Sequence, residues 1–311
     1  MDLSLAIVAS IVSVITIITS QRFFINKNIL DKIINRSSHK VIATRSGGFA
    51  VFSTIFLISI YYYISGNTIY DYSVLVPIGL LFSIGLYDDV FNVDFKLKFI
   101  FQIIAAKIII DNGLIVDNFH GLFGIFEINR LLAQLITIFI IAAIINAMNF
   151  IDGIDGLAIS VFSLFLILFE MFSLNATGLE NLTTIILFAL IPLYFFNFKK
   201  SKKVFLGDSG SLMIGGITSI YVLNILSNDY IIKEDFDLNK IIFVFSVLFY
   251  PIVDITRITI KRLIEKKSPF KADNNHIHHI LLSYLKDHYK VVVSLLLSTL
   301  MVIVFLQLLF N

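Results

Sequence analysis

Five aspartates in this sequence stand at the edges of long apolar runs, and glycines accompany most of them. They are Asp88 and Asp89, then Asp152 and Asp155, and finally Asp208. Carboxylate oxygens suit Mg²⁺, which usually keeps part of its water shell and bridges substrate phosphates as well. A glycine beside an acid lets the main chain approach a ligand closely. The pattern therefore predicts a carboxylate site for a hydrated cation and a phosphorylated substrate.

A second group of polar residues is basic. The run His276-Ile277-His278-His279 lies in a segment rich in Lys and Arg. Lys, Arg and protonated His form charge-assisted hydrogen bonds with diphosphate oxygens. Acids for a cation and basic groups for a diphosphate together indicate phosphoryl transfer, in which catalysis is mostly positioning and charge neutralisation.

Each cluster also has a simpler interpretation. The Asp-Asp pair could be a solvated loop, the last aspartate could be a helix N-cap, and the histidines could belong to an exposed basic loop. The two Asp-Gly pairs within 152–156, preceded by Asn146 and Asn149, are harder to explain without a shaped loop. The four lysines within 199–203 are interpreted as a signal of membrane topology.

Composition indicates the membrane as the place of this chemistry. Of the 311 residues, 58% are hydrophobic and 15% are charged, whereas soluble domains are about 45–50% apolar and about 25% charged. The net charge of +2 gives no reason to expect a nucleic-acid partner, and the lack of cysteine excludes disulfides and thiolate chemistry.

A membrane-spanning helix needs about 20 apolar residues, and ten runs approach that length. We therefore predict an all-α polytopic integral membrane protein with about ten transmembrane helices, in a single transmembrane transferase domain over 1–311. The first run is expected to be a retained span, because neither a basic segment nor a small-residue cleavage site flanks it. The predicted spans are 3–20, 47–64, 74–87, 97–111, 131–149, 157–174, 182–198, 211–226, 241–259 and 291–310.

Positive charge is distributed very unevenly between the two sets of loops. The loops that follow odd-numbered spans, counted together with Lys98 and Arg257 at the adjoining span ends, hold 20 Lys and Arg residues, and the other loops hold three. Because cytoplasmic loops carry the excess of Lys and Arg, we expect both termini outside. All five aspartates and the histidine run then fall on the cytoplasmic face.

In its motifs the chain resembles the polyprenyl-phosphate N-acetylhexosamine-1-phosphate transferases (glycosyltransferase 4 type), whose members act in peptidoglycan, O-antigen (lipopolysaccharide) and teichoic-acid synthesis. The similarity extends over essentially the whole chain, and the His-x-His-His run is similar to the branch that transfers GlcNAc-1-phosphate to undecaprenyl phosphate. The motifs are Asn149-Phe-Ile-Asp152-Gly-Ile-Asp155-Gly-Leu157, Phe205-Leu-Gly-Asp208-Ser-Gly-Ser211, and His276-Ile-His278-His279 preceded by Ser268-Pro-Phe-Lys-Ala-Asp273.

The resemblance implies an enzyme, a Mg²⁺-dependent phosphoglycosyltransferase (Mn²⁺ is an alternative cofactor), in the bacterial inner membrane. Its substrates would be a UDP-N-acetylhexosamine and undecaprenyl phosphate, and its products UMP and a lipid diphosphate-sugar. This reaction would be the first membrane step of cell-envelope polysaccharide synthesis. A homodimer is left open.

The resemblance also implies roles for individual residues. Asp208 would be the metal ligand, and Asp88 and Asp89 the essential pair near the lipid phosphate. Catalytic roles are also expected for Asp152, Asp155 and His279. The expected substrate-binding residues are Asn149, Asp152, Asp155, Phe205, His276, His278, His279, His39, Lys40 and Arg45.

The first loop departs from the pattern of the relatives. It has Arg36-Ser37-Ser38-His39 where they often carry Arg-Lys-x-His, and no Pro precedes Gly47-Gly48. The departure affects the roles that the resemblance implies for His39, Lys40 and Arg45.

Two other classes compete with this interpretation. An ion-coupled transporter also carries membrane acids, but it would place its site near the midplane, often between inverted repeats. A CDP-alcohol phosphatidyltransferase would need an Asp-Gly-x-x-Ala-Arg pattern, which this chain lacks.

Overall fold

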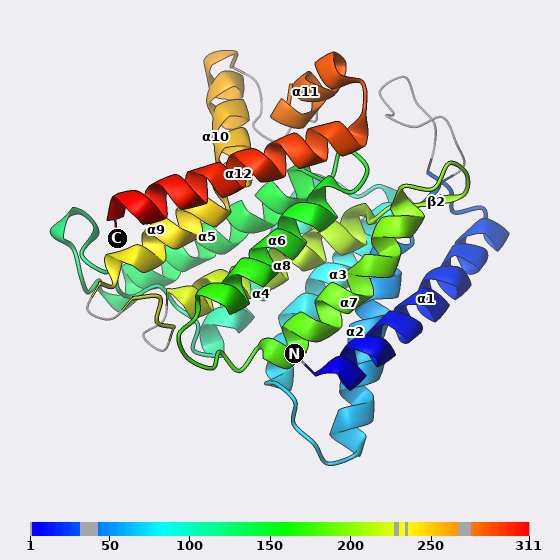
Figure 1. The fold of residues 1–311 in the computed structure, drawn as a ribbon, viewed down its shortest axis with the longest axis horizontal. Coiled ribbons are helices and arrows are strands. Elements are labelled where there is room, and N and C mark those ends of the chain that lie inside the picture. The colour runs from blue at the N-terminus through cyan, green and yellow to red at the C-terminus, as the bar shows by residue number, and fades with distance from the viewer. Residues whose placement is uncertain (1, 32–42, 227–229, 234–235, 267–274, 311) are drawn as a thin grey trace.

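The structure, a computed structural model, describes residues 2–31, 43–226, 230–233, 236–266 and 275–310. Within these ranges the chain is almost entirely helical (Figure 1). The helices are α1 (Leu3–Asn26), α2 (Gly47–Ile64), α3 (Leu75–Phe91), α4 (Phe95–Asp111), α5 (Arg130–Phe150), α6 (Leu157–Phe172), α7 (Glu180–Asn197), α8 (Gly207–Ile225), α9 (Leu238–Val247), α10 (Phe249–Ile264), α11 (Ile277–Leu285) and α12 (His288–Phe310), with short 3₁₀ turns at Tyr72–Val74 and Leu122–Gly124.

Six of the described helices are long and apolar enough to cross a membrane, or seven if the bent pair α9–α10 forms one span. They are α1, α2, α3 (with the 3₁₀ turn before it), α5, α7 and α12. The predicted class, a polytopic all-α membrane protein, is thereby confirmed. The other predicted spans also coincide with helices, namely α4, α6 and α8, so ten crossings stay a prediction.

The ninth predicted span, 241–259, corresponds to two helices, the bent pair α9 and α10. The chain bends by 73° between α9 and α10, at Leu248. Pro251 gives the physical reason, because a proline ring clashes with the carbonyl four residues earlier. That carbonyl belongs to Val247, the last residue of α9. The bend swings α10 away from the axis of α9 (Figure 1).

Helix α8 forms the centre of the bundle. Every residue of α8 except Asp208 and Asn224 is buried, and α2, α3 and α5 pack against it. Small residues make this close packing possible. A Cβ atom added at Gly85 of α3 would lie 2.3 Å from the carbonyl oxygen of Asp208, and one at Gly48 of α2 would lie 2.1 Å from the main-chain nitrogen of Gly210. The start of α8 is thus held closely by two neighbouring helices.

A two-stranded parallel sheet ties the first loop to the same place. Strand β1 (Ala43–Thr44) pairs with β2 (Lys203–Val204), and the N–H groups of Gly47 and Gly48 then donate to the carbonyls of Phe205 and Leu206, at 2.9 and 2.8 Å. In Figure 1 both marked chain ends lie away from this sheet. The placement of the two termini on one face of the membrane stays a prediction.

Candidate active site

Two of the predicted aspartates meet around a lysine. The Lys98 ammonium of α4 lies 2.9 Å from Asp88 Oδ2 of α3 and 3.2 Å from Asp208 Oδ2 of α8. Asp88 sits in the last turn of α3 and is buried, which excludes the solvated-loop interpretation. Lys98 was not among the residues predicted from the sequence, although its position ten residues after Asp88 was visible there.

Asp89, the second aspartate of the pair, contacts the start of α8 instead of Lys98. Both carboxylate oxygens of Asp89 accept main-chain hydrogen bonds from the start of α8, from the N–H groups of Asp208 and Ser209, at 2.9 Å each. These are N–H groups that a helix leaves unpaired at its N-terminus. Asp208 itself lies inside the first turn and does not cap the helix. The simpler interpretation of Asp208 as the N-cap is therefore excluded, and the capping hydrogen bonds of α8 are accepted by Asp89 of α3.

Asn149, at the end of α5, completes the surroundings of Asp208. Its side-chain nitrogen donates to Asp208 Oδ1 at 3.0 Å and contacts Ser211 Oγ at 2.7 Å. The Asp208 carboxylate is thus oriented by an amide on one oxygen and an ammonium on the other. The structure brings together Asn149, Asp88 and Asp208, as the sequence predicted.

Asp155 is held in a buried ion-pair cluster. It contacts Lys203 of β2, and its Oδ2 lies 3.0 Å from Nδ1 of His288, the first residue of α12. The same His288 nitrogen lies 3.1 Å from the main-chain nitrogen of Asp155. Burial favours the neutral acid, but the hydrogen bonds from His288 and Lys203 outweigh it and hold the pKa of Asp155 below its usual value. We call these three residues the Asp155 cluster.

Asp152 lies in the same loop and is half-buried. Burial and then the negative charges of Asp208 and Asp89 raise its pKa to about 8. The next residue, Gly153, packs on the histidine run: a Cβ there would lie 2.5 Å from His278 Nε2 and 3.1 Å from His279 Nε2. The aspartate loop and the histidines, far apart in the sequence, are therefore in contact.

The histidines differ in their surroundings. His276 Nδ1 lies 2.7 Å from Asp254 Oδ2 of α10, whose other oxygen accepts the N–H of Ile277 at 2.8 Å. His278 is fully buried, and its Nδ1 lies 2.9 Å from the Tyr250 hydroxyl. Burial lowers the pKa of His278 to about 3, so this ring is neutral at physiological pH. His279 stacks obliquely on His278, with ring centroids 4.3 Å apart.

The remaining predicted residues lie at the edge of the site or outside the described chain. Arg45 pairs with Asp31 at 2.7 Å and approaches Asp89 at 3.9 Å. Phe205 contributes main-chain hydrogen bonds between β2 and the first loop. His39 and Lys40 fall within 32–42, outside the described residues.

Besides Asp31 and Tyr250, four residues of these contacts were not predicted from the sequence: Lys98, Lys203, Asp254 and His288. Each of these four lies in a helix or beside a lysine run, where a lone charge is normally taken for a solvated side chain. The signal that could have found Asp254 and Lys98 is their position in predicted apolar spans, where charge is costly unless it is paired.

The carboxylates of the site can supply some, but not all, of the ligands that a divalent cation needs. Among the described residues, no group of three His, Asp or Glu lies close enough to hold a metal ion alone. Mg²⁺, however, usually binds one or two carboxylates and completes its shell with water and substrate phosphates. Asp88 and Asp208 already share one cationic group, the Lys98 ammonium. The residues therefore fit a cation whose other ligands come from the substrate.

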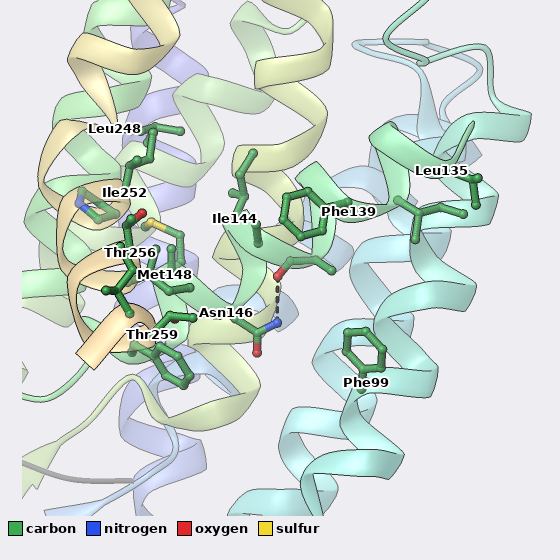
Figure 2. Close-up of a pocket in the computed structure, with 18 residues that line it drawn as sticks. Phe99, Leu135, Phe139, Ile144, Asn146, Met148, Leu248, Ile252, Thr256 and Thr259 are labelled. Carbon is green, nitrogen blue, oxygen red and sulfur yellow. Dashed lines mark hydrogen bonds between the residues drawn. The ribbon is translucent and has the colours of Figure 1, made fainter. Parts of the chain in front are cut away.

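An apolar groove begins beside this site. Its volume is about 720 Å³, and it runs between Phe99 of α4 and α5 on one side and Leu248 and α10 on the other (Figure 2). Asn146 is one of the few polar residues in its wall, with its side-chain nitrogen donating to the Ala142 carbonyl at 2.7 Å and to Gln102 Oε1 at 2.8 Å. Phe150 lines the groove as well, and its ring lies 5.6 Å from that of His276. The groove therefore opens next to the polar residues.

Comparison with known proteins identifies the family. Residues 72–226, which include all five predicted aspartates, match the sequence profile of glycosyl transferase family 4. The chain is 30% identical over 294 residues to the probable undecaprenyl-phosphate N-acetylglucosaminyl 1-phosphate transferase of Bacillus subtilis (strain 168), covering 91% of this chain and 78% of the relative. The chain belongs to glycosyl transferase family 4.

Other relatives place it in the same branch of that family. The undecaprenyl-phosphate alpha-N-acetylglucosaminyl 1-phosphate transferase of Pasteurella multocida is 36% identical over 223 residues, which cover 69% of this chain and 60% of the relative. A decaprenyl-phosphate N-acetylglucosaminephosphotransferase of Mycobacterium tuberculosis is 28% identical over 287 residues, covering 84% and 71%. The resemblance drawn from the motifs is thereby confirmed as membership of the N-acetylglucosamine-1-phosphate transferase branch of glycosyl transferase family 4.

Proposed function

We propose that this protein transfers N-acetylglucosamine-1-phosphate from UDP-N-acetylglucosamine to undecaprenyl phosphate and releases UMP. The observation that carries the proposal is the Lys98 ammonium between Asp88 and Asp208, beside an apolar groove. This arrangement offers charge for two phosphorylated substrates and an apolar surface for one of them. The names of the relatives supply the sugar and the lipid.

In the proposed step, an oxygen of the lipid phosphate forms a bond to the β-phosphorus of the nucleotide sugar. The bond from that phosphorus to the bridging oxygen breaks, and the electron pair leaves with UMP. The lipid phosphate is already an anion at neutral pH, so the step needs positioning and charge neutralisation more than a strong base. A bound Mg²⁺ would neutralise the donor diphosphate as the bond breaks.

The residues around Lys98 fit separate parts of this step. Asp208, oriented by Asn149, would hold the cation together with the donor diphosphate. Lys98 would move its ammonium from the carboxylates toward a phosphate oxygen once the cation binds. Asp88 would remain as a partner of Lys98 and direct it to the acceptor. Asp89 would act through α8, by fixing the main chain that carries Asp208.

The histidine side of the site would receive the donor. His279 lies against the loop that carries Asp152 and would contact the donor diphosphate or its sugar. His276 is oriented by Asp254 and would present its other ring nitrogen to the donor. His278, buried and neutral, would support His276 and His279, while Arg45 and Phe205 would line the opposite rim.

The polyprenyl chain would lie in the apolar groove. Phe99, next to Lys98 in the chain, lines it at one side, and Ile252 and Thr256 of α10 line it at the other (Figure 2). A lipid phosphate near Lys98 would therefore have its first isoprene units against α4, α5 and α10. The bend at Leu248 places α10 so that this wall exists.

The charge distribution supports an orientation. With ten spans, the 20 Lys and Arg residues of the odd-numbered loops would face the cytoplasm of a bacterium, and both termini would lie outside. The active site would then meet UDP-sugars on the side where they are made.

The proposal is tested with purified protein in vesicles that contain undecaprenyl phosphate. UDP-GlcNAc, UDP-GalNAc and further UDP-N-acetylhexosamines are supplied one at a time, and the lipid product is analysed by mass spectrometry. The expected product carries one added N-acetylhexosamine phosphate, formed fastest from UDP-GlcNAc. A lipid product without an N-acetylhexosamine phosphate would contradict the proposed reaction, and faster transfer from another donor would contradict only the proposed sugar.

A further inference from the structure

The connection between α4 and α5 forms a small hairpin that the reaction does not use. Asn118 and Glu127 pair in an antiparallel bridge, and the N–H of Phe119 donates to the Phe126 carbonyl at 2.8 Å. The N–H of Ile128 donates to the Asp117 carbonyl at 2.9 Å. We call residues 117–128 the α4–α5 hairpin.

The base of the hairpin is fixed to the bundle. His120 is buried, and its Nε2 lies 2.9 Å from the carbonyl of Leu226, just past the end of α8. Just before the hairpin, the N–H of Val116 donates to Thr137 Oγ1 of α5 at 2.9 Å. The hairpin is therefore held at two helices in a defined direction and is not a loose loop.

The tip of the hairpin exposes large apolar side chains. Phe123 is 91% exposed and Phe126 is 62% exposed, and Ile125 between them is exposed as well. Phe123 also has a positive φ of 54°, a conformation that is unfavourable for a bulky residue. A soluble surface would gain nothing from presenting a strained aromatic residue to water.

The position of the hairpin explains this exposure. Helix α5 begins at Arg130, directly after the hairpin, and ends at Phe150 beside the active site. Its 21 residues correspond to a length of about 31 Å at 1.5 Å per residue, close to the thickness of the hydrocarbon core of a bilayer. The hairpin therefore lies at the membrane interface opposite the active site.

The apolar tip continues a surface that already faces lipid. Leu131, Leu135 and Phe139 are all exposed along the first half of α5, a membrane-spanning helix. Asp117, Glu127 and Arg130 flank the tip and are exposed, as expected where headgroups and water begin. Apolar residues with a charged border are typical of segments that bind at the headgroup–acyl boundary.

We propose that the α4–α5 hairpin inserts its tip, with Phe123 and Phe126, into the lipid at the membrane interface opposite the active site. The partner is the bilayer itself. Because the hairpin is joined directly to α5, this contact sets the depth of α5 and so the height of Asn149 and Asp152 at the other interface. The hairpin is thus a membrane anchor for the helix that carries the aspartate loop.

The chain contains no tryptophan, so a single introduced tryptophan reports its own surroundings. Three variants are compared in nanodiscs of phosphatidylcholine and phosphatidylglycerol: Phe123→Trp in the tip, Met301→Trp at an exposed position in the middle of α12, and Thr68→Trp in the exposed turn after α2. The turn lies at the same end of the molecule as the hairpin, so Thr68→Trp is the matched control. Each is measured with lipids brominated at a shallow or a deep acyl position.

We expect the fluorescence of Phe123→Trp to be blue-shifted and quenched at least twofold by shallow bromines. Met301→Trp should be quenched more strongly by deep bromines, and Thr68→Trp should be quenched mainly by aqueous acrylamide. Water-like emission from Phe123→Trp without lipid quenching would overturn the proposal. The proposal would also be overturned if the emission were blue-shifted, were not quenched by brominated lipid and changed with the protein-to-lipid ratio. That result would mean that a second copy of the protein covers the tip. Thermal melting checks that each variant is folded.

Discussion

The carboxylate of Asp89 accepts a hydrogen bond from the main-chain N–H of Asp208, at 2.9 Å, and a second one from the N–H of the following residue. A side chain at the end of α3 thereby serves as the N-cap of α8, while the neighbouring Asp88 turns toward Lys98. Two consecutive aspartates thus have separate contacts, one that holds the start of the helix that carries Asp208 and one that pairs with Lys98.

The first prediction follows from this difference. Asp89→Ala leaves two buried N–H groups of α8 without a partner, which costs about 1–3 kcal/mol for each group. We expect a clearly lower Tm in nanodiscs and loss of transfer. Asp88→Asn should abolish transfer with a Tm close to that of the wild type, because the amide keeps the shape of the side chain. Equal Tm values for both variants would contradict the division of functions.

The second prediction concerns the cation. Removing divalent ions with EDTA should stop transfer, and Mg²⁺ or Mn²⁺ should restore it. Asp208→Asn should lower kcat by about 100-fold or more, as for the loss of a group that stabilises transition-state charge, while the Tm stays within a few degrees. Ser211→Ala, which removes only the other partner of Asn149, is the matched control and should retain most of the activity. Full activity of Asp208→Asn would place the cation elsewhere.

The third prediction concerns pH and the Asp155 cluster. The folded state holds the pKa of Asp155 below its usual value, so the cluster stabilises the protein above the unfolded-state pKa of about 3.9. That stabilisation is lost as the pH falls through the folded-state pKa. Asp155→Asn should therefore lower the Tm at pH 7, and the Tm difference from the wild type should shrink as the pH falls below about 4.

His288→Gln and Lys203→Met, which remove one partner each, provide the comparison within the same cluster. Both should lower the Tm at pH 7 by less than Asp155→Asn does. A Tm difference for Asp155→Asn that stays constant from pH 7 to pH 3 would show that the carboxylate is not stabilised by these contacts.

The fourth prediction separates two neighbouring histidines. His279→Ala should lower kcat/KM for UDP-GlcNAc by about 10- to 1,000-fold, as for the loss of one charge-assisted contact, with little change in Tm. His278→Ala should lower the Tm, because it opens a cavity beside Tyr250. Since the pKa of His278 is about 3, the pH profile of transfer should be unaffected by Tyr250→Phe. Wild-type kinetics in His279→Ala would contradict a role in donor binding and would favour a basic loop that only sets the orientation in the membrane.

Much of this architecture could be predicted from composition and spacing. Apolar runs of membrane length locate the helices, because no soluble fold would bury so many of them, and the aspartates at their edges indicate a polar site at one face. The ninth span shows where the same reasoning fails. Pro251 shows that a helix over this run cannot continue undisturbed. The sequence does not show how large the bend is, which the structure gives as 73°.

The sequence predicted which residues belong to the site better than it predicted which of them contact one another. Asn149 and Asp208 were expected to act together and lie 3.0 Å apart. Spacing along the chain could not show that Asp89 caps α8, because that contact depends on how closely α3 and α8 pack at Gly85. Nor could it show that Asp155 meets His288 across 133 residues. Such pairings are set by tertiary packing, which a single sequence does not display.

In the proposed reaction a sugar phosphate, and not a sugar alone, moves to the lipid. This is measured with UDP-GlcNAc labelled with ³²P only in the β-phosphate, with purified protein, undecaprenyl phosphate and Mg²⁺, and with Asp208→Asn as the inactive control. We expect the label to appear in the lipid fraction while the released nucleotide is unlabelled UMP. Labelled UDP together with a lipid product that lacks the label would contradict the transfer of a sugar phosphate.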